Sequence, residues 1–396
     1  MLEGKKIILG ITGGIAAYKM ASLTRLLVKE GASVKIIMSP EAVQFVSPLV
    51  LSTLSNNEVL IHLHENNQWN NHIELATWAD LMIIAPATAN TLAKAAHGLC
   101  DSLLLATFLS KKSNIIFVPA MDEDMWLNPI TQKNIEILKS VEHDILPVGE
   151  GFLASGIEGK GRMLEPEEIL LYIKEQYGRS KNLSSKKILI TAGPTQESID
   201  PVRYISNHSS GKMGVALAEA CYENGAEVTL ILGPTHIKPI YKGIEVVSVI
   251  TAEEMKITCD EYFKDTNILF MAAAVADYKP MTKSSQKIKK KDKEFDLTLC
   301  KNDDILKDLG LKKKEDQVII GFALESENEI ENALTKLKSK NLDFIVLNSL
   351  KDEGAGFGYE TNQVILINKK GDGFPSDLLS KKDIANFILF HIDSCK

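Results

Sequence analysis

The chain has 396 residues, 45% of them hydrophobic and 24% charged, and its formal net charge at pH 7 is -7. This length exceeds the usual size of one domain, so we expect two or three domains with sizeable apolar cores. The net negative charge argues against nucleic-acid binding, which relies on basic surfaces.

Cysteine usage and the apolar runs bear on the cellular compartment. The five cysteines are scattered and odd in number, and none lies at a metal-ligand spacing from another. This pattern favours a reducing setting. The N-terminus carries no signal-peptide pattern and no apolar run is long enough to span a bilayer. We therefore predict a cytoplasmic protein without membrane association.

The first half of the chain predicts alternating strands and helices. Strands are expected at 5–11, 34–38, 80–85 and 115–118, with helices at 15–29 and from Thr91. This order predicts a parallel sheet with right-handed crossovers, whose ligands bind at the carboxyl ends of the strands. The turn Thr12-Gly13-Gly14 follows the first strand and Ser39 follows the second, so both are placed to hold a phosphate. Thr88 follows the third, where a helix N-cap is expected.

Four segments of this half together resemble the FMN-dependent cysteine decarboxylases. They are GITGGIAAYK (10–19), APATAN (85–90), PAMDEDMW (119–126) and ASGIEGKGRM (154–163), in the family's order. The resemblance implies a flavodoxin-like domain at 1–178, with FMN bound between the subunits of a trimer. It implies FMN contacts from Gly13, Gly14, Ser39, Thr88 and Asn90.

The second half begins after a polar stretch at 179–186, which predicts a linker. A new α/β pattern then runs over 187–396. Strands are expected at 188–191, 227–232, 268–272, 295–299, 318–322, 344–347 and 363–367, with helices at 213–224, across 336–340 and from Lys381. We therefore expect two consecutive parallel-sheet domains, the second Rossmann-like.

The stretch from Lys187 to Gly214 combines a buried strand, a long polar loop and a helix start. Free backbone N–H groups at such a helix start bind anions, and the loop's Arg203, Asn207 and Lys212 suit carboxylate or phosphate recognition. This stretch resembles the ligase half of the bifunctional phosphopantothenoylcysteine decarboxylase/phosphopantothenate-cysteine ligase family of bacterial coenzyme A synthesis.

The resemblance implies that 4'-phosphopantothenate is joined to L-cysteine after activation by CTP. An acyl-cytidylate and pyrophosphate form, and the cysteine amine then displaces CMP. A divalent cation, Mg²⁺, is expected to bridge the phosphates. Matching the family position by position implies a role for each of these residues. Asp277 and Phe322 lie at the nucleotide, and its phosphates are faced by Lys287, Lys336 and Lys340. The nucleotide pocket is lined by Asp303, Asp304, Ile305 and Leu306. Asn207 holds the intermediate, and Arg203 acts in the active site.

Decarboxylation needs an acceptor for the electrons that the carboxylate leaves behind. In the family, flavin oxidation of the cysteine end to a thioaldehyde supplies it, and the resulting enethiol is reduced again. His72 matches the base that helps deprotonate the thiol.

Two positions depart from the family, because Asp122 stands where Asn is usual and Ser155 where Cys is usual. An ionised Asp about 4 Å from the substrate carboxylate would repel it by roughly 4 kcal/mol at a dielectric near 20. Serine is a far weaker acid than a thiol, whose pKa is about 8.5.

These departures leave several interpretations open. In the first, a protonated Asp122 donates to the substrate carboxylate and supplies the missing proton; we favour it because both changes occur together in otherwise intact motifs. In the second the domain releases the enethiol, and in the third it is an inactive FMN-binding scaffold. An FMN electron carrier with an appended nucleotide-binding module is an alternative of another class. The resemblance also implies trimeric flavin domains and dimeric ligase domains, which would build a homo-dodecamer.

Overall fold

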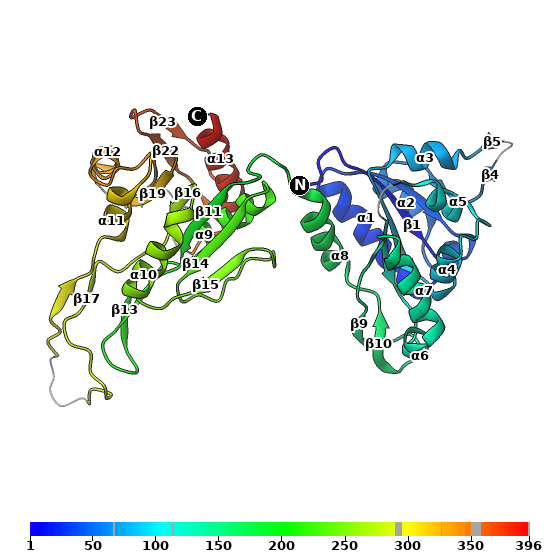
Figure 1. Cartoon of the computed structure of the whole chain (residues 1–396), viewed down its shortest axis with the longest axis horizontal. Helices are drawn as coiled ribbons and strands as arrows, with labels where there is room; N and C mark the ends of the chain where they lie inside the picture. Colours follow the sequence, from blue (N-terminus) through cyan, green and yellow to red (C-terminus); the bar gives the residue numbers. More distant parts are fainter. Residues whose placement is uncertain (66–67, 113–114, 290–294, 326, 350–357, 395–396) are drawn as a thin grey trace. The chain divides into compact units, whose positions relative to one another are not determined.

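The computed structural model describes residues 1–65, 68–112, 115–289, 295–325, 327–349 and 358–394 (Figure 1). The chain divides into two compact units, Met1–Gly178 and Arg179–Lys396. Each unit contains its own large sheet with helices around it. The predicted fold class, two consecutive α/β folds, is therefore confirmed. No helix in the described ranges combines the length and apolarity needed to cross a bilayer.

The large sheet of the first unit is entirely parallel. Its strands are β1 (Lys6–Ile11), β2 (Ser33–Met38), β3 (Val59–Leu60), β6 (Leu81–Ala87), β7 (Ile115–Pro119) and β8 (Asp144–Ile145). They lie in the order β3-β2-β1-β6-β7-β8, so Leu9 of β1 has Ile36 on one side and Ile83 on the other. The order of the chain reverses at β1, and such a switch point is where parallel sheets bind ligands.

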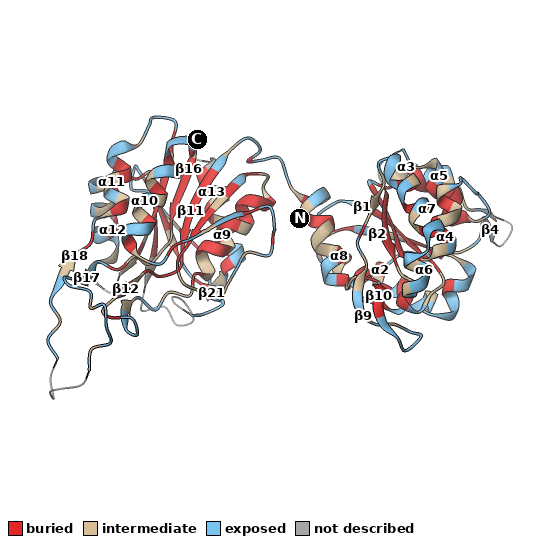
Figure 2. Cartoon of the chain, turned by 60° about the horizontal axis from the view of Figure 1, so that its bottom comes forward, coloured by how far each residue is buried: buried red, intermediate tan, exposed pale blue. Residues whose placement is uncertain are grey.

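Helices cover both faces of this sheet, and the buried strands lie between them (Figure 2). The helices are η1 (Ile15–Lys19), α1 (Met20–Lys29), η2 (Pro40–Gln44), α2 (Pro48–Ser55), α3 (His72–Trp78), α4 (Ala89–Ala96), α5 (Leu103–Ser110), α6 (Glu123–Leu127), α7 (Pro129–Ser140), α8 (Pro166–Ile173) and η3 (Lys174–Gly178). Leu9 clusters with Leu23 of α1 and Ile169 of α8. Ile8 clusters instead with α5 and with Ile135 of α7. Neighbouring strand residues point to opposite faces, so both faces of β1 are covered.

The helix predicted at 15–29 starts as a 3₁₀ turn rather than an α-helix. The Ala17 N–H donates to Gly14 O at 2.9 Å, an i to i+3 bond that winds this first turn more tightly. Two small antiparallel ladders complete the unit: β4 (His64–Glu65) with β5 (Gln68–Trp69), and β9 (Gly149–Phe152) with β10 (Glu158–Arg162).

The large sheet of the second unit is parallel except at one edge, where the last two strands pair antiparallel. Its strands are β11 (Lys187–Ala192), β14 (Glu227–Leu232), β15 (Glu245–Ser248), β16 (Ile268–Met271), β19 (Val318–Glu325), β20 (Phe344–Ser349), β22 (Ile365–Asn368) and β23 (Gly373–Pro375). They lie in the order β15-β14-β11-β16-β19-β20-β22-β23, and the order of the chain reverses at β11. The strand predicted at 363–367 corresponds to β22, which is antiparallel to β20.

The helices of this unit are α9 (Lys212–Glu223), α10 (Ala252–Tyr262), η4 (Phe263–Asp265), α11 (Ile305–Lys312), α12 (Glu329–Ser339) and α13 (Lys381–Ser394). Met255 of α10, Leu309 of α11 and Leu337 of α12 share one core with the sheet. Helix α9 contacts β11, β14 and α13. Three short ladders remain: β12 (Gln196–Ser198) with β13 (Tyr204–Ser206), β17 (Tyr278–Pro280) with β18 (Leu299–Lys301), and β21 (Thr361–Asn362) with β24 (Leu379–Ser380).

Two segments differ from the sequence-based expectation. The strand predicted at 295–299 is wrong except at Leu299, because Phe295 is 55% exposed and only the three residues of β18 find a partner strand. The predicted linker, 179–186, is bonded to the second unit. Arg179 donates to Tyr222 O at 3.0 Å and to Ala226 O at 2.8 Å.

Replacing a core residue is expected to destabilise one unit selectively. Phe117 of β7 is 0% exposed. Phe117→Ala should therefore lower the unfolding free energy of the first unit by about 3–5 kcal/mol through lost burial and a cavity. Hydrogen exchange should show faster opening of β1 and β6, with unchanged protection of β11 and β16. Equal losses in both units would contradict independent cores, and Phe270→Ala in β16 is the matched control in the second unit.

Candidate active sites

A cavity of about 830 Å³ lies at the carboxyl ends of β1, β2, β6 and β7. All five residues predicted to contact FMN line it: Gly13, Gly14, Ser39, Thr88 and Asn90. Asp122, from the segment after β7, lines it as well. The fold thus brings together one segment from each of four strand ends.

The turn after β1 is closely built against its neighbours. A Cβ atom on Gly13 would lie 2.5 Å from Glu41 Cβ, so only glycine fits at this wall of the cavity. Thr12 is buried; its hydroxyl donates to Pro86 O at 2.5 Å and accepts the Thr88 N–H at 3.3 Å. Thr12 belongs to the turn that was predicted to hold a phosphate, but its bonds to the β6 turn were not predicted. It fixes the β1 turn to the β6 turn.

Two polar groups at this cavity fit a phosphate-bearing cofactor. The Ser39 hydroxyl oxygen is buried and has no hydrogen-bond partner in the described part of the chain. A buried hydroxyl without a partner is unfavourable, so a bound polar group that pairs with Ser39 would be stabilising here. Thr88 is the N-cap of α4, as predicted, and its hydroxyl accepts the Thr91 N–H at 3.3 Å. FMN suits this wall, because a phosphate accepts from hydroxyl and backbone N–H donors.

Ser39→Ala is expected to separate cofactor binding from stability. The variant should bind FMN about tenfold more weakly, because one hydrogen bond to a charged group is lost. The stability of the flavin-free protein should not fall, because Ser39 Oγ has no partner among the described residues. Flavin titration and thermal unfolding of the flavin-free protein measure the two effects. A flavin-free variant that unfolds more easily would contradict this assignment.

The two residues that depart from the family contact each other. The Ser155 hydroxyl donates to Asp122 Oδ1 at 2.8 Å, joining the β9–β10 ladder to the segment after β7. Both side chains are exposed in the single chain. Ser155 is not among the cavity-lining residues but reaches the cavity through Asp122. The two replacements therefore form one hydrogen-bonded pair.

His72 lies apart from this cavity in the single chain. It is the first residue of α3, and the described residues that line the cavity include none from α3. Its ring makes an edge contact with Trp69, with ring centroids 5.7 Å apart. Its Nδ1 is buried and lacks a partner within the described ranges. The structure does not bring His72 together with Asp122 and Ser155.

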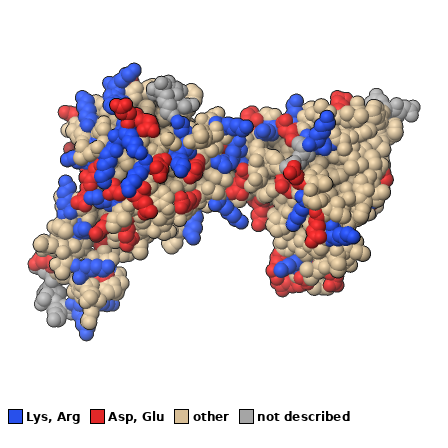
Figure 3. Space-filling view, in the orientation of Figure 1, with Lys and Arg blue, Asp and Glu red and all other residues tan. Residues whose placement is uncertain are grey.

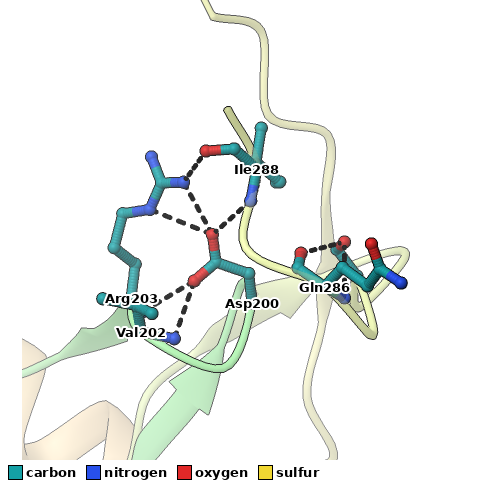
Figure 4. Close-up of polar contacts among 6 residues, drawn as sticks. Asp200, Val202, Arg203, Gln286 and Ile288 are labelled. Atoms are coloured by element: carbon teal, nitrogen blue, oxygen red, sulfur yellow. Dashed lines mark hydrogen bonds and ion pairs between the residues drawn. The ribbon is translucent and has the colours of Figure 1, made fainter. Parts of the chain in front are cut away.

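A second cavity, of about 490 Å³, lies at the carboxyl ends of β16, β19 and β20. Eight of the residues with an assigned ligase role line it: Asn207, Asp277, Asp303, Asp304, Ile305, Leu306, Phe322 and Lys340. Three others, Arg203, Lys287 and Lys336, are not among its lining residues. Arg203 and the backbone beside Lys287 instead belong to a cluster around Asp200 (Figure 4).

Asparagine side chains hold the backbone at one wall of this cavity. Asn207 Nδ2 donates to Ala274 O at 3.0 Å and to Val275 O at 3.2 Å. Both of its donor hydrogens are thus used, which leaves Oδ1 to accept from a ligand. Asn302, which sequence reasoning missed, donates to Ala276 O at 2.8 Å. These bonds fix the turn that leads to Asp277.

Two of the three predicted phosphate-binding lysines are paired with carboxylates. Lys340 Nζ lies 2.9 Å from Asp304 Oδ2, and Lys336 Nζ lies 2.6 Å from Glu325 Oε1. Burial would raise the pKa of Asp304, but hydrogen bonds from Lys340 and the Lys307 amide lower it below its usual value. On the face shown in Figure 3, basic and acidic side chains are interspersed over the second unit. Phosphates that reach these lysines therefore replace carboxylate partners.

Three further lysines line the second cavity: Lys212, Lys301 and Lys381. Of these, only Lys212 was predicted to take part in anion recognition. Lys212 begins α9 and pairs with Glu360, and Lys381 begins α13 and is 8% exposed. Burial, and then the nearby Lys212 charge, lower the pKa of Lys381. No sequence pattern indicates Lys381, which stands far along the chain from most of the other residues that line the cavity. No group of three or more His, Cys, Asp or Glu in the described residues is placed to hold a metal ion.

Comparisons with known proteins agree with this arrangement. Residues 1–178 match the family described as Flavoprotein, and residues 183–395 match the family described as DNA/pantothenate metabolism flavoprotein C-terminal domain. A solved C-terminal domain of a coenzyme A biosynthesis bifunctional protein, CoaBC, is 38% identical, covers 55% of this chain and 98% of that chain, and has a TM-score of 0.46.

Two curated relatives match most of the chain. A protein named cysteine/cysteine sulfinic acid decarboxylase, from an unidentified prokaryote, is 48% identical over 87% of this chain and 98% of that protein. The coenzyme A biosynthesis bifunctional protein CoaBC of Bacillus subtilis (strain 168) is 42% identical over 99% of this chain and 97% of that protein. The match to this relative spans both units, and each of the two family matches covers one unit. The chain therefore belongs to the family of coenzyme A biosynthesis bifunctional proteins.

Proposed function

We propose that this chain makes and then decarboxylates 4'-phosphopantothenoylcysteine. The second unit ligates 4'-phosphopantothenate to L-cysteine with CTP and Mg²⁺, and the first unit converts the product to 4'-phosphopantetheine with FMN. The observation that carries the proposal is the second cavity, where eight residues assigned to the nucleotide and the intermediate meet at one end of a parallel sheet. Family membership over both units supports the pairing of the two reactions.

The ligase residues divide into those that orient and those that balance charge. Asp277 accepts from the cytosine amine, and Asn207 accepts from the acyl part through Oδ1. Lys340 and Lys336 exchange Asp304 and Glu325 for phosphate oxygens. Fixed cations of this kind stabilise the charge that develops during nucleotidyl transfer. Mg²⁺ is bound mainly through the phosphates.

In the first unit, Gly13, Ser39 and Thr88 would hold the FMN phosphate and Asn90 would contact the cofactor. FMN, when bound, supplies the reversible oxidation of the cysteine end. The Asp122–Ser155 pair orients the substrate carboxylate and passes a proton to the enethiol. Since His72 lies off the cavity of its own chain, a second copy in a trimer supplies it. Trimeric first units and dimeric second units then build a dodecamer.

The test is to incubate the full-length chain with 4'-phosphopantothenate, cysteine, CTP and Mg²⁺. We expect CMP, pyrophosphate, carbon dioxide and 4'-phosphopantetheine. Absence of CMP overturns the ligase assignment and favours a flavin electron carrier. Ligation without carbon dioxide would identify the first unit as a scaffold, and a product two hydrogens lighter than 4'-phosphopantetheine would identify an enethiol-releasing enzyme.

Decarboxylation of free cysteine is a second candidate function. The name of the relative that is 48% identical suggests it, and the Asp122–Ser155 pair is a change at the decarboxylase site that could accompany a different substrate. Supplying cysteine or cysteine sulfinic acid without CTP and 4'-phosphopantothenate separates the two. Our proposal expects no carbon dioxide under those conditions.

Asp122→Asn is expected to slow decarboxylation at least about tenfold and to leave ligation unchanged. An amide keeps the shape of the side chain but cannot supply a proton. Asp124→Asn, an exposed neighbour in the same segment, is the control. Carbon dioxide release and product mass measure the effect. Unchanged 4'-phosphopantetheine formation by the Asp122 variant would remove the proton-donor role.

A further inference from the structure

A buried carboxylate, Asp200, joins the turn between β12 and β13 to the loop that follows β17 (Figure 4). Asp200 is 2% exposed. Its Oδ1 accepts the backbone N–H groups of Val202 at 2.8 Å and Arg203 at 2.9 Å. These two bonds close the turn of the hairpin. They leave Oδ2 for contacts outside it.

Oδ2 of Asp200 binds both an arginine and a distant segment. It accepts from Arg203 Nε at 3.0 Å, from Arg203 Nη2 at 2.6 Å and from the Ile288 N–H at 3.1 Å. Arg203 Nη2 also donates to Ile288 O at 2.7 Å. Both backbone polar groups of Ile288 are therefore bound by one ion pair. The Ser284 N–H donates to Ile199 O at 2.9 Å, which adds a second attachment of the same loop.

The charge on Asp200 is maintained by these donors. Burial alone would raise the pKa of Asp200, but the backbone N–H groups of Val202 and Ile288 and the Arg203 guanidinium hold it well below its usual range. Arg203 is in turn committed, because Nε and Nη2 both point at Asp200. The guanidinium could bind a substrate through these atoms only by releasing both Asp200 and the loop.

We propose that Asp200 is a positioning residue of the ligase. Through Arg203 and Ile288 it fixes the lysine loop, defined as residues 281–289 after β17, so that Lys287 is held for the nucleotide phosphates. The inference rests on the proposed function of the second cavity and adds a residue to it. Lys287 is exposed and directly precedes the bound Ile288. A loop ordered before the ligand arrives loses less conformational entropy on binding, so affinity rises.

Asp200→Asn in the full-length, FMN-bound protein tests the inference. The amide keeps the size of the side chain but removes its charge and places a donor where an acceptor is needed. We expect the KM for CTP to rise about tenfold, as the loss of one charged hydrogen bond implies. The kcat and the KM for cysteine should change less than about twofold, because the lost hydrogen bond acts on the binding of CTP. Mere partial misfolding would instead lower kcat and leave the KM for CTP unchanged.

The matched control is Glu197→Gln. Glu197 of β12 is 5% exposed, and it accepts a backbone N–H, that of Ala252 at 2.9 Å, from α10 rather than from the lysine loop. We expect this variant to lose stability without a change in the KM for CTP. If Asp200→Asn does not fold, Arg203→Lys serves instead, since an ammonium keeps the charge but not the bond geometry. It should raise the KM for CTP about threefold, as a part of that interaction is kept.

A double-mutant cycle with Lys287→Ala decides whether Asp200 acts through Lys287. We expect the Asp200→Asn effect on the KM for CTP to vanish in the Lys287→Ala background. An equal rise in both backgrounds, or no rise in either, overturns the inference. So does a Lys287→Ala variant whose KM for CTP equals that of the wild type.

Hydrogen exchange of the substrate-free protein separates this inference from the proposed function. Faster exchange over 281–289 in Asp200→Asn, but not in Glu197→Gln, supports the attachment even if the wild type liberates no CMP. Unchanged exchange there overturns it even if the wild type is an active ligase.

Discussion

A Gly161→Ala variant is expected to be purified almost free of FMN while its ligase unit remains active. Gly161 of β10 has a φ of +134°, and a Cβ atom there would lie 2.1 Å from Met121 O and 3.3 Å from Asp122 C. Both contacts are with backbone, which cannot rotate away as a side chain can. Gly161, Met121 and Asp122 all line the first cavity, so relieving the clash changes the cavity itself.

The expected loss of flavin affinity is about 10- to 100-fold, the equivalent of the free-energy cost of overpacking. Flavin absorbance of the purified protein and CMP release measure the two units separately. Gly156→Ala is the control, because Gly156 lies between β9 and β10 with a φ of +82° but nothing within 4 Å of a Cβ atom. The control isolates backbone strain from the clash. A Gly161→Ala protein with full flavin content would show that the cavity wall can move.

His72→Asn is expected to reduce decarboxylation about 100- to 10,000-fold, the usual contribution of a positioned general base. Ligation should be unaffected, since the described residues that line the second cavity all belong to the second unit. Flavin content should also be unaffected, since His72 is not a lining residue of the first cavity. Carbon dioxide release, CMP release and flavin absorbance give the three measurements. A flavin-free His72→Asn protein would contradict its assignment as a base.

Co-expression of the His72→Asn and Gly161→Ala chains should restore part of the decarboxylation that each lacks alone. In a mixed trimer, the cavity of a His72→Asn chain can receive an intact His72 from a Gly161→Ala chain. Recovery follows only if His72 of one chain acts at the cavity of another chain. Our proposal requires this, because His72 does not line the cavity of its own chain. Mixed oligomers without recovered activity would place His72 at its own chain's cavity.

Much of the architecture was predictable because the central strands of both large sheets are short apolar runs buried on both faces. The runs that became β1, β11 and β16 are examples, and the polar residues that follow strands were correctly expected at one end of the sheet. The strand at 295–299 failed because an apolar pattern does not show whether a partner strand is present.

The sequence predicted which segments form each site, but not which side chains contact one another there. Motif order placed Asn207 and Asp277 at one cavity, yet it could not show that Arg203 binds Asp200 or that Lys336 binds Glu325. Those pairings depend on how side chains from distant segments meet. For the same reason Lys381, at the start of the last helix, could be found only in the folded chain.

The carboxylate partners of Lys336 and Lys340 also bear on selectivity. Because each ammonium already has a counter-charge, the empty cavity exerts little attraction on a single small anion such as orthophosphate or chloride. A nucleoside triphosphate offers several linked oxyanions at once, so it can displace both carboxylates together at the entropic cost of one molecule. Under the proposed function, the two ion pairs would favour a ligand with several linked oxyanions over a single small anion.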